Sequence, residues 1–266
     1  MSEHVPEGGE SPRITLRDLR YAVDGREILG GITLDVAPGE ILCVMGLSGA
    51  GKSTILRCIA GLVSATSGQL LIDNVDIVGL KERELLPIRA KMGVVFQYAA
   101  LFDSMNVYAN IAFGLLRGPR RMEFKKKSRG ELTQRIQEHL REVGLPGIEK
   151  RLPPELSGGM RRRVGLARAL ATDPEIILYD EPTSGLDPVT AAAIDQLIVR
   201  TRDKKNVTSV VVSHDMRSIF RIADKILMLY EGKAQIYGTP SEVQNSDDPV
   251  VQQFIRGEVE GPIEIG

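Results

Sequence analysis

The chain has 266 residues, of which 42% are hydrophobic, and its formal net charge is −1 at pH 7. Such a composition is typical of a soluble intracellular protein with one large core or a core and a subdomain. The weak net charge offers no strong field to attract nucleic acid. No apolar run approaches the roughly 18–20 residues that cross a bilayer. Cys43 and Cys58 lie in apolar segments without CxxC spacing, so we expect reduced core residues and neither a disulfide nor a metal pair.

The first elements expected along the chain are a tail and an antiparallel hairpin. Residues 1–12 are polar and lack the basic and then apolar pattern of a secretion signal, which predicts a flexible tail. Residues 14–23 alternate between apolar and polar, an Asp-Gly turn follows at 24–25, and residues 27–36 form the returning strand. Residues 70–72 predict another short strand, so an antiparallel sheet should open the fold.

The most specific motif is a phosphate-binding loop that joins an apolar strand, residues 40–45, to a helix, residues 53–61. Its sequence GLSGAGKS fits G-x-x-x-x-G-K-[ST] without a mismatch. Strand, loop and helix together aim backbone N–H groups at one anion, which disfavours the alternative of a glycine-rich turn with an incidental lysine. We expect Lys52 to reach the β- and γ-phosphates of a nucleotide and the Ser53 hydroxyl to ligate Mg²⁺. The residues expected to contact the nucleotide here are Gly46, Leu47, Ser48, Gly49, Ala50, Gly51, Lys52, Ser53 and Thr54.

Three continuous apolar runs predict buried strands of a parallel sheet covered on both faces. They are residues 93–96, 176–179 and 209–212. Residues 226–237 predict a late hairpin that turns at Glu231-Gly232. Residues from about 106 to 172 look helical and split the α/β core in the sequence, so we expect an inserted helical subdomain at about 98–172.

Polar side chains that could act in chemistry follow two of these strands. After a phosphate loop, Asp180 is expected to hold Mg²⁺ through water and Glu181 to polarise the water that attacks the γ-phosphate; an Asp-Glu pair alone would be an ordinary solvated strand end. His214 follows the 209–212 strand at the same edge of the sheet. We expect it to contact the γ-phosphate and the attacking water, against the alternative of a structural hydrogen bond. His139 lies in a charged helix and is expected to be exposed.

A second anion-binding helix start is predicted about a hundred residues after the first. Ser157 is a good N-cap, and Gly158 and Gly159 expose backbone N–H groups there. One nucleotide needs only one such site, so the second would be useful if it closed over a nucleotide held by another subunit. The arginines at residues 161–163 lie near the positive end of the helix dipole, where a cation lowers the stability of the helix. This unfavourable placement indicates a nucleotide or partner role for at least one arginine, while the others face solvent.

In this order the motifs resemble those of ABC transporter ATPase subunits, over residues 14–240. In that resemblance Gln97 is the Q-loop, residues 156–160 are the signature, residues 176–181 are Walker B with its glutamate, residues 184–187 are the D-loop and His214 is the switch. It implies an α/β P-loop NTPase fold with a mostly parallel core sheet, an N-terminal antiparallel β-subdomain and an inserted helical subdomain. The domain would span residues 13–240, followed by a C-terminal tail at 241–266.

The same resemblance implies a chemistry and an assembly. The subunit would hydrolyse ATP with Mg²⁺ as a head-to-tail homodimer, with Glu181 and His214 as the catalytic residues. Ser157, Gly158 and Gly159 of one copy would complete the site built on Lys52 of the other. Gln97 and Asp187 would join the nucleotide site. The metal ligands would be Ser53, Gln97 and Asp180.

A narrower resemblance is to the Mla-type (Mce-associated) ATPases that power phospholipid movement between bacterial membranes. It rests on residues 96–107, on Met160 before three arginines, and on residues 251–262. It implies an MlaE-like permease, MCE-domain and STAS-domain subunits, lipid as the transported substrate, no nucleic acid, and a peripheral place on the cytoplasmic face of the inner membrane. A polar-solute importer needs only another permease. Soluble ABC ATPases of DNA repair or translation usually carry zinc-binding cysteines, coiled-coil insertions or tandem cassettes, which this sequence lacks.

Two departures from the general ABC pattern affect these expectations. Most ABC ATPases have Gln where Met160 stands, although Mla-type sequences share the methionine. The adenine-stacking aromatic usually falls near Val23, and the nearest aromatic here is Tyr21, two residues earlier on the same strand face. Both adenine stacking and an ordinary core or surface position remain open for Tyr21.

Two further segments have open alternatives. The basic run at 117–129 is either a solvated surface or a contact with anionic lipid headgroups or the permease. Four apolar residues follow the Q-loop: Tyr98, Leu101, Phe102 and Met105. They either fill the core of the small subdomain or form a groove for a cytoplasmic helix of the permease.

Overall fold

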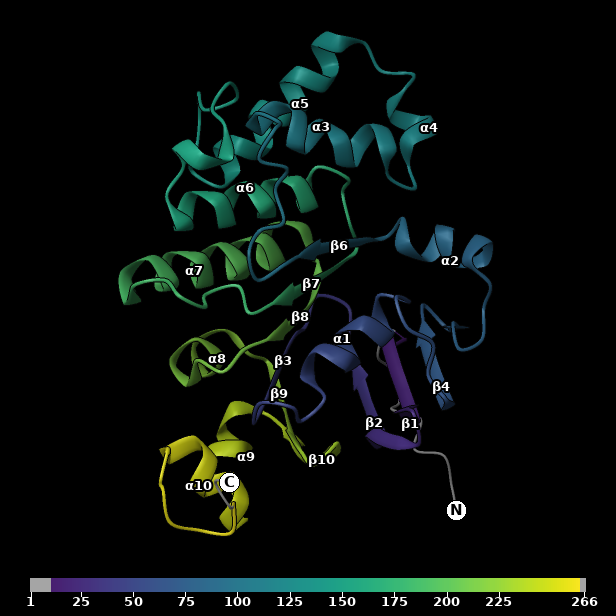
Figure 1. Cartoon of the computed structure of the whole chain (residues 1–266), viewed down its shortest axis with the longest axis vertical. Coiled ribbons are helices and arrows are strands. Elements are labelled where there is room, and N and C mark those ends of the chain that lie inside the picture. Colours follow the sequence, from purple (N-terminus) through teal and green to yellow (C-terminus); the bar gives the residue numbers. More distant parts are fainter. Residues whose placement is uncertain (1–10, 264–266) are drawn as a thin grey trace.

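The computed structural model describes residues 11–263, so most of the expected N-terminal tail lies outside the described residues. Its central sheet has six strands in the order β10-β9-β3-β8-β7-β6 (Figure 1). The strands are β3 (Ile41–Gly46), β6 (Met92–Val95), β7 (Ile176–Asp180), β8 (Thr208–Val212), β9 (Lys225–Tyr230) and β10 (Lys233–Gly238). All neighbours pair in parallel except β9 and β10, which form the predicted late hairpin. The carboxyl ends of β3, β6, β7 and β8 therefore meet at one edge.

Side chains of the central strands alternate between two cores, one on each face of the sheet. On β3, Leu42 and Val44 belong to one core, whereas Cys43 and Met45 belong to the other. Such a sheet must be apolar on both faces, which explains the continuous apolar runs of its strands. Cys58 lies in the core opposite that of Cys43, and both thiols are buried and free, which confirms the expectation of reduced core cysteines.

A second, antiparallel sheet has the order β2-β1-β4-β5 and confirms the expected N-terminal β-subdomain. Its strands are β1 (Ile14–Val23), β2 (Arg26–Val36), β4 (Ser67–Ile72) and β5 (Val75–Asp76). Helix α1 (Lys52–Ile59) shares one core with both sheets. Helix α2 (Glu82–Arg89) has no counterpart among the predicted elements, because Pro87 inside it is a residue that normally interrupts a helix.

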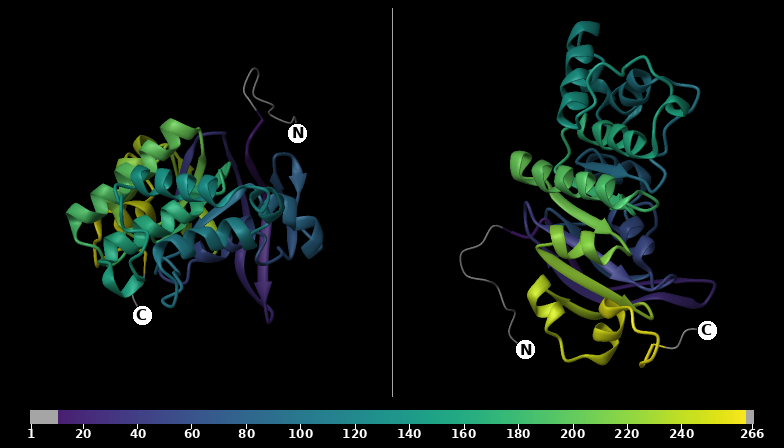
Figure 2. Two further views of the ribbon diagram at one scale, coloured as in Figure 1. Left: turned by 90° about the horizontal axis from the view of Figure 1, so that it is seen from above. Right: turned by 90° about the vertical axis from the view of Figure 1, so that its left-hand side faces the viewer.

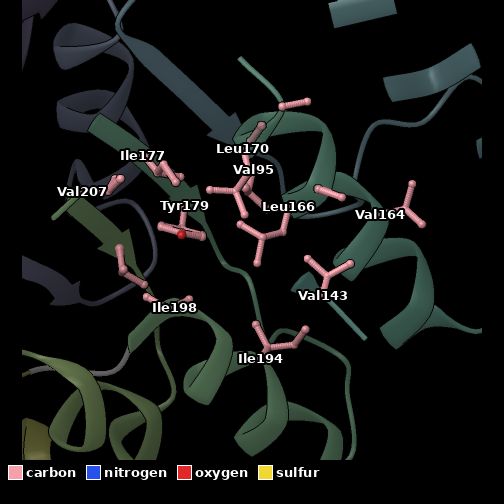
Figure 3. Close-up of a cluster of buried hydrophobic side chains, with 14 of the residues drawn as sticks. Val95, Val143, Val164, Leu166, Leu170, Ile177, Tyr179, Ile194, Ile198 and Val207 are labelled. Carbon is pink, nitrogen blue, oxygen red and sulfur yellow. The ribbon is translucent and has the colours of Figure 1, made fainter. Parts of the chain in front are cut away.

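Four helices lie between β6 and β7 in the chain and account for the expected helical insertion. They are α3 (Val107–Arg117), α4 (Arg121–Phe124), α5 (Arg129–Glu142) and α6 (Gly158–Leu170). Helices α3 to α5 stand beyond α6, at the end of the molecule farthest from the C-terminal helices (Figures 1 and 2). Helix α6 is the connection to the sheet: Leu166 and Leu170 lie beside Val95 of β6 and Tyr179 of β7 in the shared core (Figure 3).

The C-terminal region corrects one sequence-based expectation. The segment expected as a tail contains α9 (Pro240–Gln244) and α10 (Pro249–Arg256), which follow α7 (Pro188–Lys205) and α8 (Met216–Ile222). Val243 and Val251 are fully buried in the same core as α7 and α8. Each of the two helices is too short to show a helical period clearly, and only packing against the sheet makes them stable.

Helix α5 is tied to the end of α7 by a carboxylate, Glu142. It accepts hydrogen bonds from Lys204 at 2.7 Å and lies 2.8 Å from His139 Nδ1 and 3.5 Å from Lys205 Nζ. The expectation that His139 is exposed is wrong: it is 5% exposed, because it shares the buried face of α5 with Ile136. Burial lowers the pKa of His139.

We expect Glu142→Gln to lower thermal stability at neutral pH. Burial opposes ionisation of Glu142, but hydrogen bonds from Lys204 and His139 outweigh it and lower its pKa from 4.5 to about 2. The ionised group therefore stabilises the fold above pH 4.5, and this contribution is lost as the pH falls through 2. The difference in melting temperature between wild type and Glu142→Gln should shrink over that window. A pH-independent difference, or the same loss in the exposed control Glu138→Gln, would contradict this role.

Candidate functional site

The phosphate loop fills the space between β3 and α1 and depends on two glycines. At Gly46 the backbone φ is 144°, and a β-carbon there would lie 2.1 Å from the Leu229 carbonyl oxygen. At Gly51 φ is 100°, and a β-carbon would lie 2.8 Å from a methyl of Leu29. Any larger residue would therefore push the loop away from β2 and β9. The glycines let the loop turn tightly before α1 begins at Lys52.

Lys52 and Ser53 lie where the sequence pattern places them. The Lys52 ammonium donates to the carbonyls of Gly46 and Leu47, each at 2.8 Å, and so lies over the loop. Burial lowers its pKa, although the negative charges of Glu181 and Asp180 act in the opposite direction. The Ser53 hydroxyl lies 3.5 Å from an Asp180 carboxylate oxygen, so the phosphate loop and the end of β7 share one site.

Glu181 and His214 come together at the ends of two neighbouring strands. His214 Nδ1 lies 2.7 Å from Glu181 Oε2; the Glu181 side chain is 13% exposed and that of His214 is 63% exposed. The Glu181 backbone N–H donates to Val212 at 2.9 Å and holds the residue against β8. Its φ is 50°, in the left-handed region that glycine favours. The sequence placed both residues at one edge, but only the fold shows their direct contact.

Gln97 lies beside the segment that follows Glu181. Its side-chain amide donates to the Ser184 hydroxyl at 3.4 Å. The chain then makes a left-handed turn through Ala99 and Ala100, with φ of 59° and 44°. Arg168 of α6 donates to both carbonyls of this turn, at 2.8 and 2.7 Å, and so fixes the Q-loop segment on α6. Burial lowers the pKa of Arg168.

Ser157 caps α6 by accepting a hydrogen bond from the Met160 backbone N–H at 3.2 Å. A β-carbon at Gly159 would lie 2.5 Å from a methyl of Thr190, so the start of α6 packs closely on α7. Within residues 11–263, no hydrogen bond or ion pair joins Ser157 to the phosphate loop. Asp187 caps α7 by accepting from the N–H groups of Val189 and Thr190, and the hydrogen bonds from Thr190 lead in lowering its pKa. The nucleotide contacts expected for Gly158, Gly159 and Asp187 remain predictions.

Each of the three arginines after Met160 donates a hydrogen bond to a backbone carbonyl. Arg161 donates to Leu156 O at 2.8 Å, and Arg163 to Val143 O at 3.5 Å. Arg162 is 8% exposed and donates to the carbonyls of Glu181 and Ser184. The expectation that two of them are solvated is wrong, since the close approach of α6 to neighbouring backbone could not be read from the sequence.

Tyr21 and one residue of the basic run at 117–129 make ordinary packing and hydrogen-bonding contacts within the chain. Tyr21 is half-buried and packs against the core shared by α1 and the two sheets, so adenine stacking stays a prediction. Within the basic run, Arg120 donates to Thr172 O at 2.5 Å and lies over the Phe124 ring, which is a structural role. Exposed residues of the run include Arg117, Arg121, Lys125 and Lys126.

Aromatic side chains gather on the surface next to the Q-loop. Tyr98 is 83% exposed and Phe102 is 43% exposed, and the Phe102 ring packs 4.8 Å from that of Phe113 on α3. Buried Asn110 donates to the carbonyls of Phe102 and Met105 and accepts from the Phe102 N–H, which fixes this loop. Leu101 instead packs against the core. The helical period of α3 could have pointed to Phe113, which the sequence reasoning missed.

Comparisons with known proteins agree with this geometry. The family model described as ABC transporter matches residues 29–184. The probable ribonucleotide transport ATP-binding protein Mkl of Mycobacterium leprae is 42% identical over 94% of this chain and 70% of its own length. The intermembrane phospholipid transport system ATP-binding protein MlaF of Escherichia coli is 38% identical over 94% of this chain and 91% of its own length.

Among solved structures, the dimeric ATP-binding cassette MJ0796 bound to ADP and Pi has a TM-score of 0.75 and 33% identity, covering 85% of this chain and 98% of that one. CbiO1 of Clostridium perfringens, part of the ABC transporter complex cbiONQ, has a TM-score of 0.80 and 27% identity, over 94% and 95% of the two chains. No helix within residues 11–263 is both long and apolar enough to cross a membrane.

Proposed function

The chain belongs to the ABC transporter family as an ATP-hydrolysing subunit, and from that membership we propose that it powers phospholipid transport between bacterial membranes through a partner permease. The observation that supports the lipid cargo is the match to MlaF, which covers 91% of that protein as well as 94% of this chain. The name of Mkl, 42% identical, favours a polar ribonucleotide instead. That cargo is the second candidate.

In the proposed site, the phosphate oxygens of the nucleotide and its Mg²⁺ ion bind to different groups of the chain. The backbone N–H groups of the phosphate loop and the start of α1 bind the phosphate oxygens, and Lys52 leaves its carbonyl partners to reach the β- and γ-phosphates. The hydroxyl of Ser53, the carboxylate of Asp180 and the amide oxygen of Gln97 are hard oxygen donors that suit Mg²⁺. Bound there, Mg²⁺ would neutralise charge on the phosphate oxygens.

The described residues fit an Mg²⁺ ion that arrives with its nucleotide. Within residues 11–263 no cluster of three or more His, Cys, Asp or Glu side chains could hold a metal ion. Mg²⁺ usually binds one or two protein carboxylates and completes its shell with water and substrate phosphates. The pair of Ser53 and Asp180, with their oxygens 3.5 Å apart, supplies such a partial shell.

Glu181 is the proposed general base for the attacking water. Its carboxylate oxygen Oε2 lies 2.7 Å from His214 Nδ1, which places the imidazole beside the proposed base. The other ring nitrogen of His214, Nε2, would then face the γ-phosphate and the water. The strained backbone of Glu181 and its bond to β8 hold the carboxylate at the sheet edge before the reaction.

The proposed assembly contains two copies of this chain on an MlaE-like permease, with MCE-domain and STAS-domain subunits, at the cytoplasmic face of the inner membrane. The likeness to dimeric MJ0796 supports the pairing. In each site, Ser157 and the two glycines after it would come from the second copy, which accounts for an anion-binding helix start with no bond to its own phosphate loop.

The exposed aromatic side chains beside the Q-loop are the proposed permease contact. We expect Tyr98→Asp with Phe102→Asp to leave the chain folded and able to bind ATP, because Tyr98 is 83% exposed and Phe102 43% exposed and neither belongs to the buried core, but to abolish copurification with the permease. Leu101 is the wrong residue for this test, since it packs on the core. Val75→Asp, at an exposed residue of the antiparallel sheet, is the control. Normal assembly of the double variant would contradict the contact.

The cargo is tested on the same complex. Copurification with the permease followed by lipid mass spectrometry should recover bound phospholipid, and ATP with Mg²⁺ should change its amount in wild type but not in Glu181→Gln. A complex that carries no phospholipid, and whose ATP turnover rises with a ribonucleotide, would favour the polar cargo instead.

A further inference from the structure

Arg162 is a buried cation whose partners are neutral. Its side chain is 8% exposed, and its guanidinium donates to Glu181 O at 2.9 Å and to Ser184 O at 2.6 Å. Within residues 11–263 no carboxylate lies within ion-pair distance of it, and burial lowers its pKa although Tyr98 and Glu181 act in the opposite direction. Burying an arginine without a counter-ion is costly, so the two carbonyl contacts need a reason beyond packing.

The two carbonyls belong to a turn that holds the proposed base. Glu181 O also accepts from the Ser184 N–H at 3.3 Å, and the Ser184 hydroxyl accepts from Gln97 at 3.4 Å. A non-glycine residue with φ of 50° persists only where its surroundings hold it. Arg162 bonds both ends of this turn with the planar fork of one side chain, an arrangement that lysine cannot reproduce.

Arg162 also joins this turn to the capped start of α6. It lies in the second turn of that helix, five residues after Ser157. The adjacent arginines do not reach the site, since Arg161 and Arg163 bond the carbonyls of Leu156 and Val143. Of the three, only Arg162 connects the helix that would face the second copy with the Glu181 segment of its own copy.

We propose that Arg162 is a positioning residue for ATP hydrolysis. It holds the Glu181 carboxylate next to the attacking water, and it couples the position of that carboxylate to the position of the Ser157 end of α6. This rests on the proposed role of Glu181 as the base. When the start of α6 engages the nucleotide of the second copy, the carboxylate in its own site is brought into place. Binding of ATP to the phosphate loop does not depend on Arg162.

The test compares Arg162→Lys and Arg162→Gln with Arg163→Lys and Arg163→Gln in the full chain. We expect both Arg162 variants to lower kcat about 10- to 100-fold with KM for ATP unchanged, because a catalytic group displaced by about 1 Å costs a rate factor of that size. Both Arg163 variants should turn over ATP at nearly the wild-type rate. An unchanged kcat in folded Arg162→Lys would overturn the proposal, as would parallel losses of kcat, ATP affinity and melting temperature.

A double variant separates this proposal from the function on which it rests. If Arg162 acts through Glu181, adding Arg162→Lys to Glu181→Gln should not lower the residual turnover further, and the double variant should still dimerise with ATP. Multiplied losses in the double variant would overturn the role of Arg162 alone. Normal turnover in Glu181→Gln itself would instead overturn the assigned base, and the proposal for Arg162 with it.

Discussion

Glu181→Gln is expected to lower ATP turnover about 1,000-fold while ATP binding is retained, because the change removes only the proposed general base. The phosphate loop, Lys52 and the oxygens of Ser53 and Asp180 stay in place, so the nucleotide should still bind. Uncleaved ATP should then hold two copies together. Steady-state hydrolysis, nucleotide titration and size-exclusion chromatography with ATP measure the three effects.

A matched carboxylate at the other end of β7 provides the control. Glu175 precedes the strand, pairs with Arg13 at 2.6 Å and lies at the edge opposite the site. Glu175→Gln should hydrolyse ATP at nearly the wild-type rate. Turnover at the wild-type rate in Glu181→Gln, or equal losses in both variants, would show that the base lies elsewhere.

Ser157→Arg is expected to abolish both ATP-dependent dimerisation and turnover, with binding of ATP to the separate subunit preserved. The arginine removes the cap of α6, a loss of about 1 kcal/mol, and places a bulky cation where the helix start would receive phosphate. The free energy of unfolding should therefore fall modestly, whereas the ATP site formed between two copies should be lost. Analytical ultracentrifugation with ATP, together with a thermal melt, separates the two effects.

Ser157→Thr keeps a hydroxyl acceptor at the same position and serves as the control. It should cap α6 and dimerise with ATP, with turnover within a few-fold of wild type. A Ser157→Arg protein that still dimerises with ATP would remove this helix start from the interface between copies.

Much of the geometry of the candidate nucleotide site could be predicted because each part is local in the sequence. The phosphate loop needs glycines at fixed spacing, and the apolar runs before Gln97, Asp180 and His214 are what a sheet buried on both faces requires. Parallel pairing then places the ends of those strands at one edge. The contact between Glu181 and His214 depends on the order β8-β7, which no local pattern contains.

The features that the sequence missed all depend on long-range packing. The sequence predicts a role for at least one arginine at 161–163, but only the fold, which places α6 beside the turn after β7, shows that this arginine is Arg162. His139 is polar yet faces the core, and α9 and α10 exist because the sheet offers them an apolar face. In each of these, the tertiary contact outweighs the local preference of the residue.

The central claim, that two copies share each ATP site, is tested most directly by mixing two inactive variants. Lys52→Ala should lose ATP binding and Ser157→Arg should lose dimerisation, so neither hydrolyses ATP alone. In a mixed dimer, one site combines an intact Lys52 from one copy with an intact Ser157 from the other. An equal mixture should recover up to about a quarter of the wild-type rate, since half of randomly paired dimers carry one intact site of two. A mixture as inactive as its two components would contradict the shared site.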